Sequence, residues 1–371
     1  MENYERGKKL GEGAWGVVTS ATQKSTGRLV AIKKIAMKRG KYTEGANFTA
    51  LREIKLLNEL KHENVIELVD VFLIHEDMNL VFEFCETDLE SILMEQSVVL
   101  KPEHIKCHMQ MLVNGMTFLH QNFVLHRDLK PNNLLYAADG KLKIADFGLA
   151  RTYGSPRRHM TPTVVTRWYR PPELCFGCRE YGAAVDMWGV GCIFAELMCR
   201  RPLFPGISDF DQVARIFQVM GTPTEENWPE HCALPEYVEF EPQKPVDLSS
   251  VLSAASPDAM DLLLKLLVLR PDKRATAEEA RQHPYFTKHH PPPCAPAQLA
   301  LPIPEERRNK VRDGPTHDIL LKASQSFVLF TTSAMPAVGL NKVSIPGSNQ
   351  NPCVPGSNQL ADSRWLLHSS G

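Results

Sequence analysis

Eight consecutive residues, His126 to Asn133, carry the side chains needed to move a phosphoryl group onto a hydroxyl. Asp128 can accept the hydroxyl proton, and Lys130 can neutralise charge on the group being transferred. Asn133 follows Asp128 by five residues, and an Asp-Phe-Gly triplet begins at Asp146, so an amide and a second carboxylate are available for Mg²⁺. The order and loop-like spacing of these segments favour a catalytic loop over an ordinary polar loop.

A glycine-rich segment near the N-terminus points to a nucleotide. Residues 10–18 form a turn between two expected strands, and residues 29–34 form the next strand, which contains Lys33. Dinucleotide-binding proteins share the Gly-x-Gly-x-x-Gly pattern, but there a helix follows the last glycine. Here β-branched residues typical of a strand follow Gly16, which disfavours a dinucleotide-dependent oxidoreductase. We expect the glycines to let the backbone approach ATP phosphates closely, with Lys33 binding the α- and β-phosphates.

An amphipathic helix is predicted from residue 47 to 60. Leu51, Ile54 and Leu57 fall on its apolar stripe, and Glu53 lies off that stripe. On a helix beside the glycine-rich loop, Glu53 can form the ion pair that orients Lys33. Strands expected at residues 65–68 and 79–84 then complete a five-stranded small sheet.

The chain leaves this sheet through a segment suited to binding adenine. Backbone groups of Glu83 and Cys85 can bind the adenine edge, Phe82 closes the back of the pocket, and Asp88 can accept a hydrogen bond from the ribose. The residues expected to form the ATP site are Leu10, Gly11, Glu12, Gly13, Ala14, Trp15, Gly16, Val17, Val18, Ala31, Lys33, Glu53, Phe82, Glu83, Cys85, Asp88, Leu135 and Asp146.

Helical patterns dominate from residue 88 onward. A long helix is predicted over residues 102–121, a buried one over 186–197, and further helices over 210–220, 258–269 and 277–283. A hairpin is expected around Asp139-Gly140, between the catalytic loop and Asp146. Residues 149–170 show neither a helical nor a strand period and contain two Ser/Thr-Pro sites, which suits a mobile activation segment.

Length and composition predict two lobes and a tail. The chain has 371 residues, of which 43% are hydrophobic, and we divide it at 1–84, 85–288 and 289–371. The last part begins with three prolines and is rich in Pro, Ser, Asn and Gln, so we expect it to be mostly disordered, with a short helix at 304–312 as the one exception considered.

Charge and cysteine content exclude several classes of protein. The net charge of −1 gives no case for direct nucleic-acid or membrane binding, and charges throughout the first twenty residues exclude a signal-peptide core. We therefore expect a soluble, non-secreted protein. Nine cysteines without framework spacing indicate a reducing compartment. The lone Cys-x-x-Cys at 175–178 has no second pair with zinc-finger spacing, so we interpret it as incidental.

From about residue 4 to 286 the chain resembles eukaryotic protein kinases, with all the major motifs in order. The resemblance implies an α+β, bilobal protein kinase fold. A small antiparallel β-sheet lobe with one regulatory helix would be joined by a hinge near residue 85 to a larger, mainly helical lobe. Residues 47–54 are similar to the helix that cyclin-dependent kinases press against a cyclin, and residues 164–170 are typical of proline-directed kinases. Mitogen-activated kinases are disfavoured because Thr161-Pro162-Thr163 replaces their Thr-x-Tyr.

Within that family the chain is most similar to the CDK-activating branch. The similar stretches are residues 50–57, 86–90, the pair Asn132-Asn133, and residues 154–156. This resemblance implies a cyclin H-type partner, a RING-finger assembly factor and membership of the transcription factor TFIIH. It further implies activity on the activation-segment threonines of cell-cycle kinases and on the RNA polymerase II repeats. The expected location is the nucleus, with the cytoplasm as a second location.

The resemblance also assigns roles in the activation segment. Thr161 and Ser155, each followed by proline, are expected phosphorylation sites, and Arg52, Arg127 and Arg151 would converge on the Thr161 phosphate. Thr166 would hydrogen-bond to the catalytic Asp128 and Lys130 and shape the pocket for a substrate proline.

Two departures from the family pattern and two alternatives accompany this interpretation. Pro171 replaces the usual alanine, although Glu173 can still pair with Arg274, and Ala14-Trp15 replaces the Thr-Tyr pair through which cell-cycle kinases are inhibited. One alternative is another cyclin-dependent kinase that acts directly in cell-cycle progression. The other is a non-catalytic pseudokinase scaffold, which the presence of Lys33, Asp128, Asn133 and Asp146 disfavours.

Overall fold

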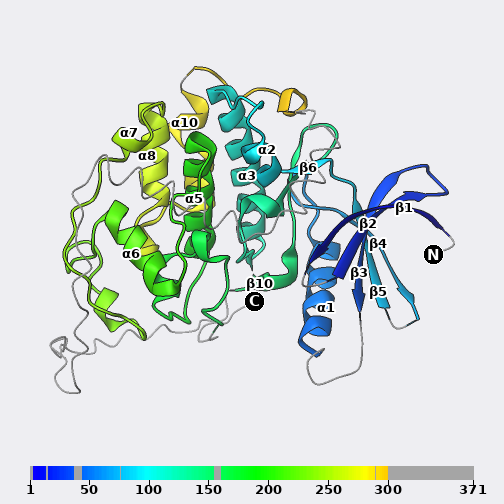
Figure 1. Ribbon diagram of the computed structural model, residues 1–371, viewed down its shortest axis with the longest axis horizontal. Helices are drawn as coiled ribbons and strands as arrows, with labels where there is room; N and C mark the ends of the chain where they lie inside the picture. The colour runs from blue at the N-terminus through cyan, green and yellow to red at the C-terminus, as the bar shows by residue number, and fades with distance from the viewer. Residues whose placement is uncertain are drawn as a thin grey trace, which may run out of the picture.

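The chain folds into a β-sheet lobe and a helical lobe that meet at the catalytic loop (Figure 1). The computed structural model describes residues 3–13, 16–36, 44–75, 77–153, 160–288 and 290–299. This architecture confirms the predicted bilobal α+β fold, while the division of the chain at residues 84 and 288 stays a prediction. Within the described ranges, no helix is long and apolar enough to cross a membrane.

The small lobe is one antiparallel sheet with the strand order β1-β2-β3-β5-β4. Its strands are β1 (Tyr4–Gly13), β2 (Gly16–Gln23), β3 (Leu29–Ala36), β4 (Leu68–Ile74) and β5 (Asp77–Glu83). The five strands were predicted, but the fourth was misplaced at residues 65–68. Val65 and Ile66 are instead buried and pair with Ile144 of the large lobe, where the amide of Ile66 donates to the Ile144 carbonyl over 2.9 Å.

Gly16 is required by a close approach between neighbouring strands. Its φ is 132°, and a Cβ atom added there would lie 1.9 Å from the carbonyl oxygen of Lys34. Gly13 and Gly16 are directly paired where β1 turns into β2. Any larger residue at position 16 would therefore push β2 away from β3, which carries Lys33.

The regulatory helix α1 (Glu44–Glu59) buries part of the predicted apolar stripe but not Leu51. Leu51, expected in the core, is 50% exposed, whereas Glu53 is 2% exposed. Leu57 is buried as predicted, and Ala50 and Glu53 lie on the same face at helical spacing, so the inward face includes Glu53 in place of Leu51. Hydrophobicity alone missed this because a carboxylate stands in the middle of the buried face.

The large lobe is built around α5 (Ala184–Cys199), which is buried along most of its length. Trp188 and Phe194 are fully enclosed there, and α3 and α8 pack on either side. The other helices are α2 (Leu89–Met94), α3 (Pro102–Gln121), α4 (Pro172–Cys175), α6 (Asp209–Met220), α7 (Leu248–Val251), α8 (Pro257–Leu266), α9 (Ala277–Arg281) and α10 (Pro284–Thr287), with 3₁₀ turns at His231–Ala233 and Pro271–Lys273.

Short strands hold the catalytic segments between the lobes. A small sheet has the order β6-β8-β9, formed by β6 (Thr87–Asp88), β8 (Leu134–Tyr136) and β9 (Leu142–Ile144), and β7 (Val124–Leu125) pairs with β10 (Arg151–Thr152). The hairpin expected around Asp139-Gly140 is thus confirmed as β8–β9. The catalytic loop lies between β7 and β8, and Asp146 follows β9. Further 3₁₀ turns lie at Pro131–Asn133, Phe147–Leu149 and Arg167–Tyr169.

Residues 290–299 form a strap that returns to the β8–β9 hairpin. The amide of Cys294 donates to the Glu103 carbonyl over 3.2 Å, and Leu299, in the last 3₁₀ turn (Pro296–Leu299), is 2% exposed. A Cβ atom at Gly140 would lie 1.8 Å from the Pro296 carbonyl oxygen, so only glycine accommodates the strap. The rest of the predicted tail, including the helix considered at 304–312, lies outside the described residues.

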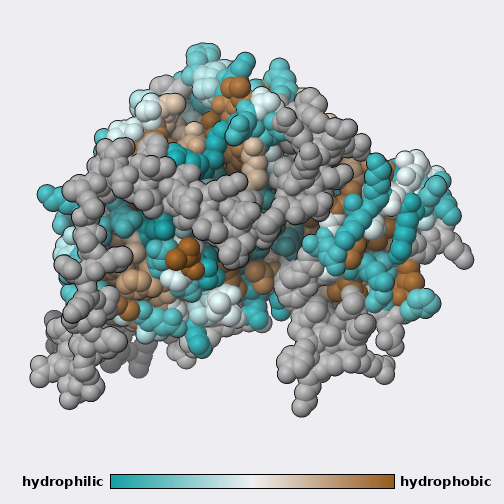
Figure 2. All heavy atoms as spheres, viewed as in Figure 1, coloured by the Kyte–Doolittle hydropathy of each residue, from teal (hydrophilic) through white to brown (hydrophobic). Residues whose placement is uncertain are grey.

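The coloured surface in Figure 2 is mixed in character. Hydrophilic side chains cover much of the outer face of the small lobe, and apolar patches lie between them. The exposed large apolar residues include Leu51 on α1 and Ile207 and Phe210 beside α6. Isolated exposed apolar residues are common in folded proteins, so only their position relative to the site gives them meaning.

Candidate active site

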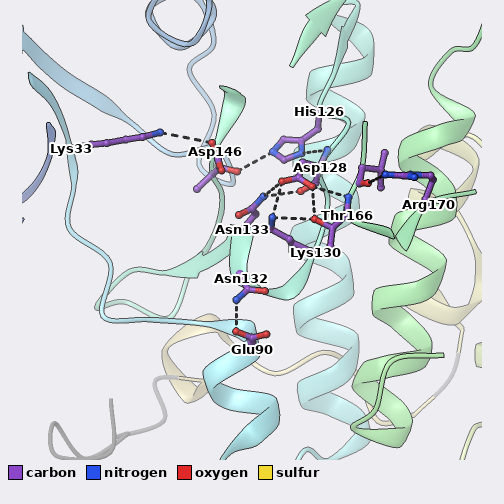
Figure 3. A network of polar contacts seen from close by, with 12 residues as sticks. Lys33, Glu90, His126, Asp128, Lys130, Asn132, Asn133, Asp146, Thr166 and Arg170 are labelled. Atoms are coloured by element: carbon purple, nitrogen blue, oxygen red, sulfur yellow. Dashed lines mark hydrogen bonds and ion pairs between the residues drawn. The ribbon is translucent and has the colours of Figure 1, made fainter. Parts of the chain in front are cut away.

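The catalytic loop holds the Asp128 carboxylate in a closed network of donors (Figure 3). Its Oδ2 accepts from Lys130 Nζ over 2.8 Å and from Asn133 Nδ2 over 3.1 Å. Its Oδ1 accepts from the hydroxyl of Thr166 over 2.8 Å and from the backbone amide of Thr166 over 3.0 Å. Lys130 also donates to the Thr166 hydroxyl over 3.1 Å. The structure therefore brings together all four residues predicted to be catalytic.

The electrostatics of this network keep Asp128 ionised. Burial alone would raise the pKa of Asp128, but the adjacent Lys130 and the hydrogen bond from Thr166 outweigh burial and hold its pKa below the ordinary value. An ionised carboxylate within reach of a substrate hydroxyl can orient it and accept its proton.

Lys33 on β3 meets two carboxylates from different elements. Its Nζ lies 3.1 Å from Glu53 Oε2 on α1 and 3.8 Å from Asp146 Oδ1. Burial would lower the pKa of Lys33, but the charges of Glu53 and Asp146 outweigh it and raise the pKa, so the ammonium stays charged. This fixed cation between the sheet and the catalytic loop is suited to binding phosphate oxygens.

Asn133 and Asp146 offer oxygens suited to Mg²⁺. Asn133 donates through Nδ2 to the Asp128 carbonyl and carboxylate, which leaves its Oδ1 as the remaining polar atom. Asp146 adopts a left-handed backbone (φ 64°), and its side chain is 34% exposed beside Lys33. Within the described ranges, no three His, Cys, Asp or Glu side chains form a metal cage. Magnesium is ordinarily held by one or two protein oxygens together with phosphates, so this pair fits the ion.

The residues of the predicted adenine pocket come from both lobes. Ala31 is paired with Phe82 across β3 and β5, and Leu135 is paired with Asp88 across β8 and β6. The Glu83 side chain points away from this role, because its Oε1 accepts from the Glu67 amide over 2.8 Å and from Lys143 Nζ over 2.9 Å. The Glu83 amide also donates to the Glu67 carbonyl over 3.1 Å, so the carbonyl is the group of Glu83 left for the predicted contact with a base.

The structure describes the surroundings of some other members of the predicted ATP site but not of all. Burial raises the pKa of the Cys85 thiol to about 12, so this side chain is a neutral neighbour of the pocket. Asp88 also caps α2, accepting from the Ser91 amide over 2.8 Å. Ala14 and Trp15 lie outside the described residues. The roles of the predicted ATP-site residues stay predictions.

Asp186 on α5 supports the catalytic loop and was not singled out from the sequence. Its buried carboxylate accepts from the backbone amides of His126 (3.0 Å) and Arg127 (2.8 Å) and contacts His120 Nε2 at 3.0 Å. Burial would raise the pKa of Asp186, but these partners hold it below the ordinary value. A carboxylate at the start of a mostly apolar helix was the available signal, because buried charges are normally paired.

His126 is a structural member of the loop. Its Nε2 is 2.9 Å from the Ala145 carbonyl, its Nδ1 is 3.3 Å from the Asp128 amide, and its ring packs edge-on against Phe147. Because the carbonyl can only accept, the proton lies on Nε2. His126 therefore ties the catalytic loop to the segment that carries Asp146.

Asn132, the first residue of the double asparagine, contacts α2. Its Nδ2 donates to the carboxylate of Glu90, and burial together with Asp88 raises the pKa of Glu90 (Figure 3). The contact joins the catalytic loop to the helix that follows the adenine pocket.

The activation segment places Thr161 near two of the three predicted arginines. Thr161 is exposed, and its carbonyl accepts from the hydroxyl of Tyr181, which in turn accepts from Arg127. Arg151 pairs with Leu125 at the start of β10, close to the catalytic loop. Arg52 lies on α1, and its convergence on Thr161 stays a prediction. Ser155 lies outside the described residues.

Two buried side-chain contacts hold the end of the segment against the rest of the large lobe. Glu173 receives two hydrogen bonds from Arg274, at 2.6 and 2.7 Å, so the predicted pair forms despite Pro171. Tyr169 donates to the buried Glu196 carboxyl over 2.7 Å. Burial raises the pKa of Glu196 to about 7.

Glu196 should make the stability of the protein depend on pH. Its folded-state pKa is about 7 against 4.5 ordinarily, so between these values the folded chain binds a proton that the unfolded chain lacks. Stability should therefore fall as the pH rises through this range, by about 3 kcal/mol. Urea unfolding measured from pH 4.5 to 8 should show the free energy of unfolding of Glu196→Gln rising by that amount relative to that of the wild type. Glu230→Gln, at an exposed position, is the control. If the stability difference between Glu196→Gln and the wild type did not change with pH, the assignment would be contradicted.

Comparison with known proteins agrees with this geometry. The chain matches the protein kinase domain model over residues 4–286. It is 51% identical to cyclin-dependent kinase D-1 of Oryza sativa subsp. japonica, over 84% of this chain and 73% of that protein. It is also 51% identical to cyclin-dependent kinase 7 of Xenopus laevis, over 82% of this chain and 86% of that protein.

A solved structure is similar to the chain throughout the two lobes. It is the CAK complex of Chaetomium thermophilum bound to ATP-gamma-S, with a TM-score of 0.76 and 44% sequence identity. The match covers 80% of this chain and 94% of that one.

Proposed function

This chain belongs to the protein kinase family, among the cyclin-dependent serine/threonine kinases related to kinase 7 and kinase D, and we propose that it is the activating kinase of other cyclin-dependent kinases. Its proposed substrates are the activation-segment threonines of those kinases and the heptad repeats of RNA polymerase II. One observation carries the catalytic part of this proposal: Asp128, Lys130 and Thr166 form a closed hydrogen-bonded triangle beside the Lys33–Glu53 ion pair.

ATP is the phosphate donor of this family, and we propose that Mg²⁺ accompanies it. Asn133 and Asp146 would hold the ion, which supplies positive charge to the phosphates when bound. Lys33, oriented by Glu53, binds the α- and β-phosphates. Asp128 orients the substrate hydroxyl and accepts its proton, and Lys130 balances charge at the transferred group. Most of the acceleration comes from positioning and electrostatics.

The backbone near the end of the activation segment favours a proline beside the phosphorylated residue. Val165 has φ 67°, a strained conformation for a β-branched residue. The Arg170 guanidinium donates to the carbonyls of Val164 and Val165, both over 2.9 Å. Because these two carbonyls already accept from Arg170, they cannot accept from the substrate. If the residue after the phosphorylated one is not proline, its backbone amide leaves water without finding an acceptor here. Proline has no amide hydrogen and loses nothing, which explains a proline-directed preference.

A cyclin is the expected partner of α1. Leu51 is half exposed on the outer face of this helix, while Glu53 on its inner face binds Lys33. A protein that covers the outer face would hold Glu53 in place. We propose a cyclin of the H type, a RING-finger assembly factor, association with TFIIH, and a nuclear location, on the grounds of the resemblance to the CDK-activating branch.

Arg127 supports a phosphate switch at Thr161. Its side chain is buried and donates through Nε to the Leu149 carbonyl and through Nη1 to Tyr181. Within the described ranges no carboxylate lies at ion-pair distance from this guanidinium. Toward the described part of the chain, three of its five N–H donors therefore have no acceptor, and they lie next to a segment that carries an exposed threonine. A phosphate on Thr161 would satisfy them with charge-assisted hydrogen bonds.

Thr161→Ala should lower kcat/KM of the cyclin-bound, phosphorylated kinase by about 10- to 100-fold, because charge-assisted hydrogen bonds that order the segment are lost. The measurement is phosphate transfer from labelled ATP, with intact-mass analysis confirming the phosphorylated state. Thr163→Ala, an exposed threonine in the same segment, is the matched control. Equal activity of the Thr161→Ala and Thr163→Ala variants would refute the switch.

Co-purification and paired substrates test the proposed function itself. We expect an H-type cyclin to accompany the chain from cells, and the complex to phosphorylate both an inactive cyclin-dependent kinase and a heptad-repeat peptide. Asp146→Asn serves as the inactive control. A different cyclin, with phosphorylation of neither substrate, would favour the alternative of a kinase that acts directly in cell-cycle progression. Transfer equal to that of the control would favour a scaffold.

A further inference from the structure

Tyr181 bridges the activation segment and the catalytic loop through a single hydroxyl. It lies in the turn between α4 and α5, and its oxygen accepts from Arg127 Nη1 over 3.0 Å and donates to the Thr161 carbonyl over 2.7 Å. The direction of both hydrogen bonds is unambiguous, because a guanidinium only donates and a carbonyl only accepts. The hydroxyl proton therefore points at Thr161.

The electrostatics keep this bridge in its neutral, donating form. Burial raises the pKa of Tyr181, and the charges of Arg127 and Arg151 only partly offset that effect. Both arginines predicted to bind the Thr161 phosphate from this lobe thus lie within electrostatic reach of the Tyr181 ring. The Tyr181 hydroxyl is held by hydrogen bonds to Arg127 and to the Thr161 carbonyl, in the region that would receive the phosphate.

Both residues that the bridge connects are anchored elsewhere. Arg127 has φ 65°, and its amide donates to Asp186 while its Nε donates to the Leu149 carbonyl, so its guanidinium has one orientation. On the other side, the buried Met160 donates its amide to the Arg179 carbonyl over 2.9 Å. The turn that contains residues 179–181 therefore forms hydrogen bonds with two consecutive residues of the activation segment, one of which is the expected phosphorylation site.

We propose that Tyr181 is a positioning residue that sets the backbone of Thr161 beside Arg127, so that phosphate added to the threonine meets the unspent arginine donors without rearrangement of the segment. This rests on the proposed function of Thr161 as a phosphate switch. A preorganised segment loses less conformational entropy when the phosphate binds, and Tyr181 thereby increases the gain in activity that phosphorylation produces.

The test compares Tyr181→Phe with Tyr153→Phe in the cyclin-bound kinase. Phenylalanine keeps the ring and removes only the hydroxyl. Tyr153 is a suitable control because its hydroxyl donates to the His120 carbonyl over 3.3 Å and does not contact Thr161. Each change is made with Thr161 intact and with Thr161→Ala, and kcat/KM is measured on one peptide. Intact-mass analysis confirms full Thr161 phosphorylation, and thermal unfolding confirms folding.

We expect Tyr181→Phe to lower kcat/KM about 5- to 10-fold when Thr161 is phosphorylated and less than about 2-fold in the Thr161→Ala background, whereas Tyr153→Phe changes neither. An equal loss in both backgrounds would mean a merely structural role and would overturn the proposal. No loss in either background would also overturn it. If Thr161→Ala alone retains full activity, the phosphate switch itself fails, and that outcome is separate from the other two.

Discussion

Replacing Asp128 by Asn should lower kcat by about 10²- to 10⁴-fold while ATP affinity changes little. The side chain keeps its shape but can no longer accept a proton, and its amide would face one of the donors now supplied by Lys130, Asn133 and Thr166. The ATP-contacting Lys33–Glu53 pair lies on other elements and should remain intact. Single-turnover transfer and equilibrium binding of an ATP analogue separate the two effects.

Asp139→Asn is the matched control for this change. Asp139 is an exposed aspartate in the turn between β8 and β9, on the hairpin that follows the catalytic loop. The Asp139→Asn variant carries the same chemical change but leaves the network around Asp128 intact. A loss in kcat below about 10-fold for Asp128→Asn would show that the carboxylate neither accepts the proton nor orients the hydroxyl, because general-base catalysis is worth more than that.

Asp186→Asn should both destabilise the protein and reduce its activity. An amide in place of the carboxylate leaves one of the buried backbone donors, His126 or Arg127, without an acceptor, which costs about 1–3 kcal/mol. Arg127 holds a strained positive φ only while its amide is bound, so the catalytic loop should relax. We expect kcat to fall about 100-fold, since misplacement of the reacting groups by about 1 Å has that effect.

The pH dependence of the Asp186→Asn defect gives a second readout. The folded-state pKa of Asp186 is lowered, so its stabilising contribution is present above its unfolded value of about 4 and is lost as the pH falls through the folded-state pKa. The stability difference between wild type and variant should therefore shrink in acid. Asp272→Asn, at an exposed ion pair, should change stability by less than about 0.5 kcal/mol. A pH-independent difference for Asp186→Asn would mean that the carboxylate charge is not what stabilises the loop.

Motifs confined to one short segment were predicted well. Asp128, Lys130 and Asn133 lie within six residues, so the local path of the chain brings them together and the sequence is sufficient to identify them. Lys33 and Glu53 are twenty residues apart, yet the glycine-rich loop and the helix pattern placed each of them on the correct element. The pairing of Glu173 with Arg274, across a hundred residues, was predictable only through the resemblance to protein kinases.

Residues whose partners come from unrelated elements were missed. Asp186 accepts from two backbone amides and Tyr181 donates to a backbone carbonyl; backbone groups are present at every position, so these partners leave no trace in the sequence. On α1 the burial of Leu57 was predicted correctly and that of Leu51 wrongly, because Glu53 lies on the buried face where the pattern requires an apolar residue. β4 was misplaced because Val65 and Ile66 are apolar for a different reason, namely their burial against the large lobe.

By itself, the sequence determined the fold class through its resemblance to protein kinases, and it determined the chemistry of the catalytic loop because motif spacing is a local property of the chain. Only the tertiary structure decided what holds that loop and what controls it. The carboxylate of Asp186, the hydroxyl of Tyr181 and the unspent donors of Arg127 have their roles because folding removes them from water and faces them with particular partners. Burial and direction create those roles, and neither is a property of a residue until the chain has packed.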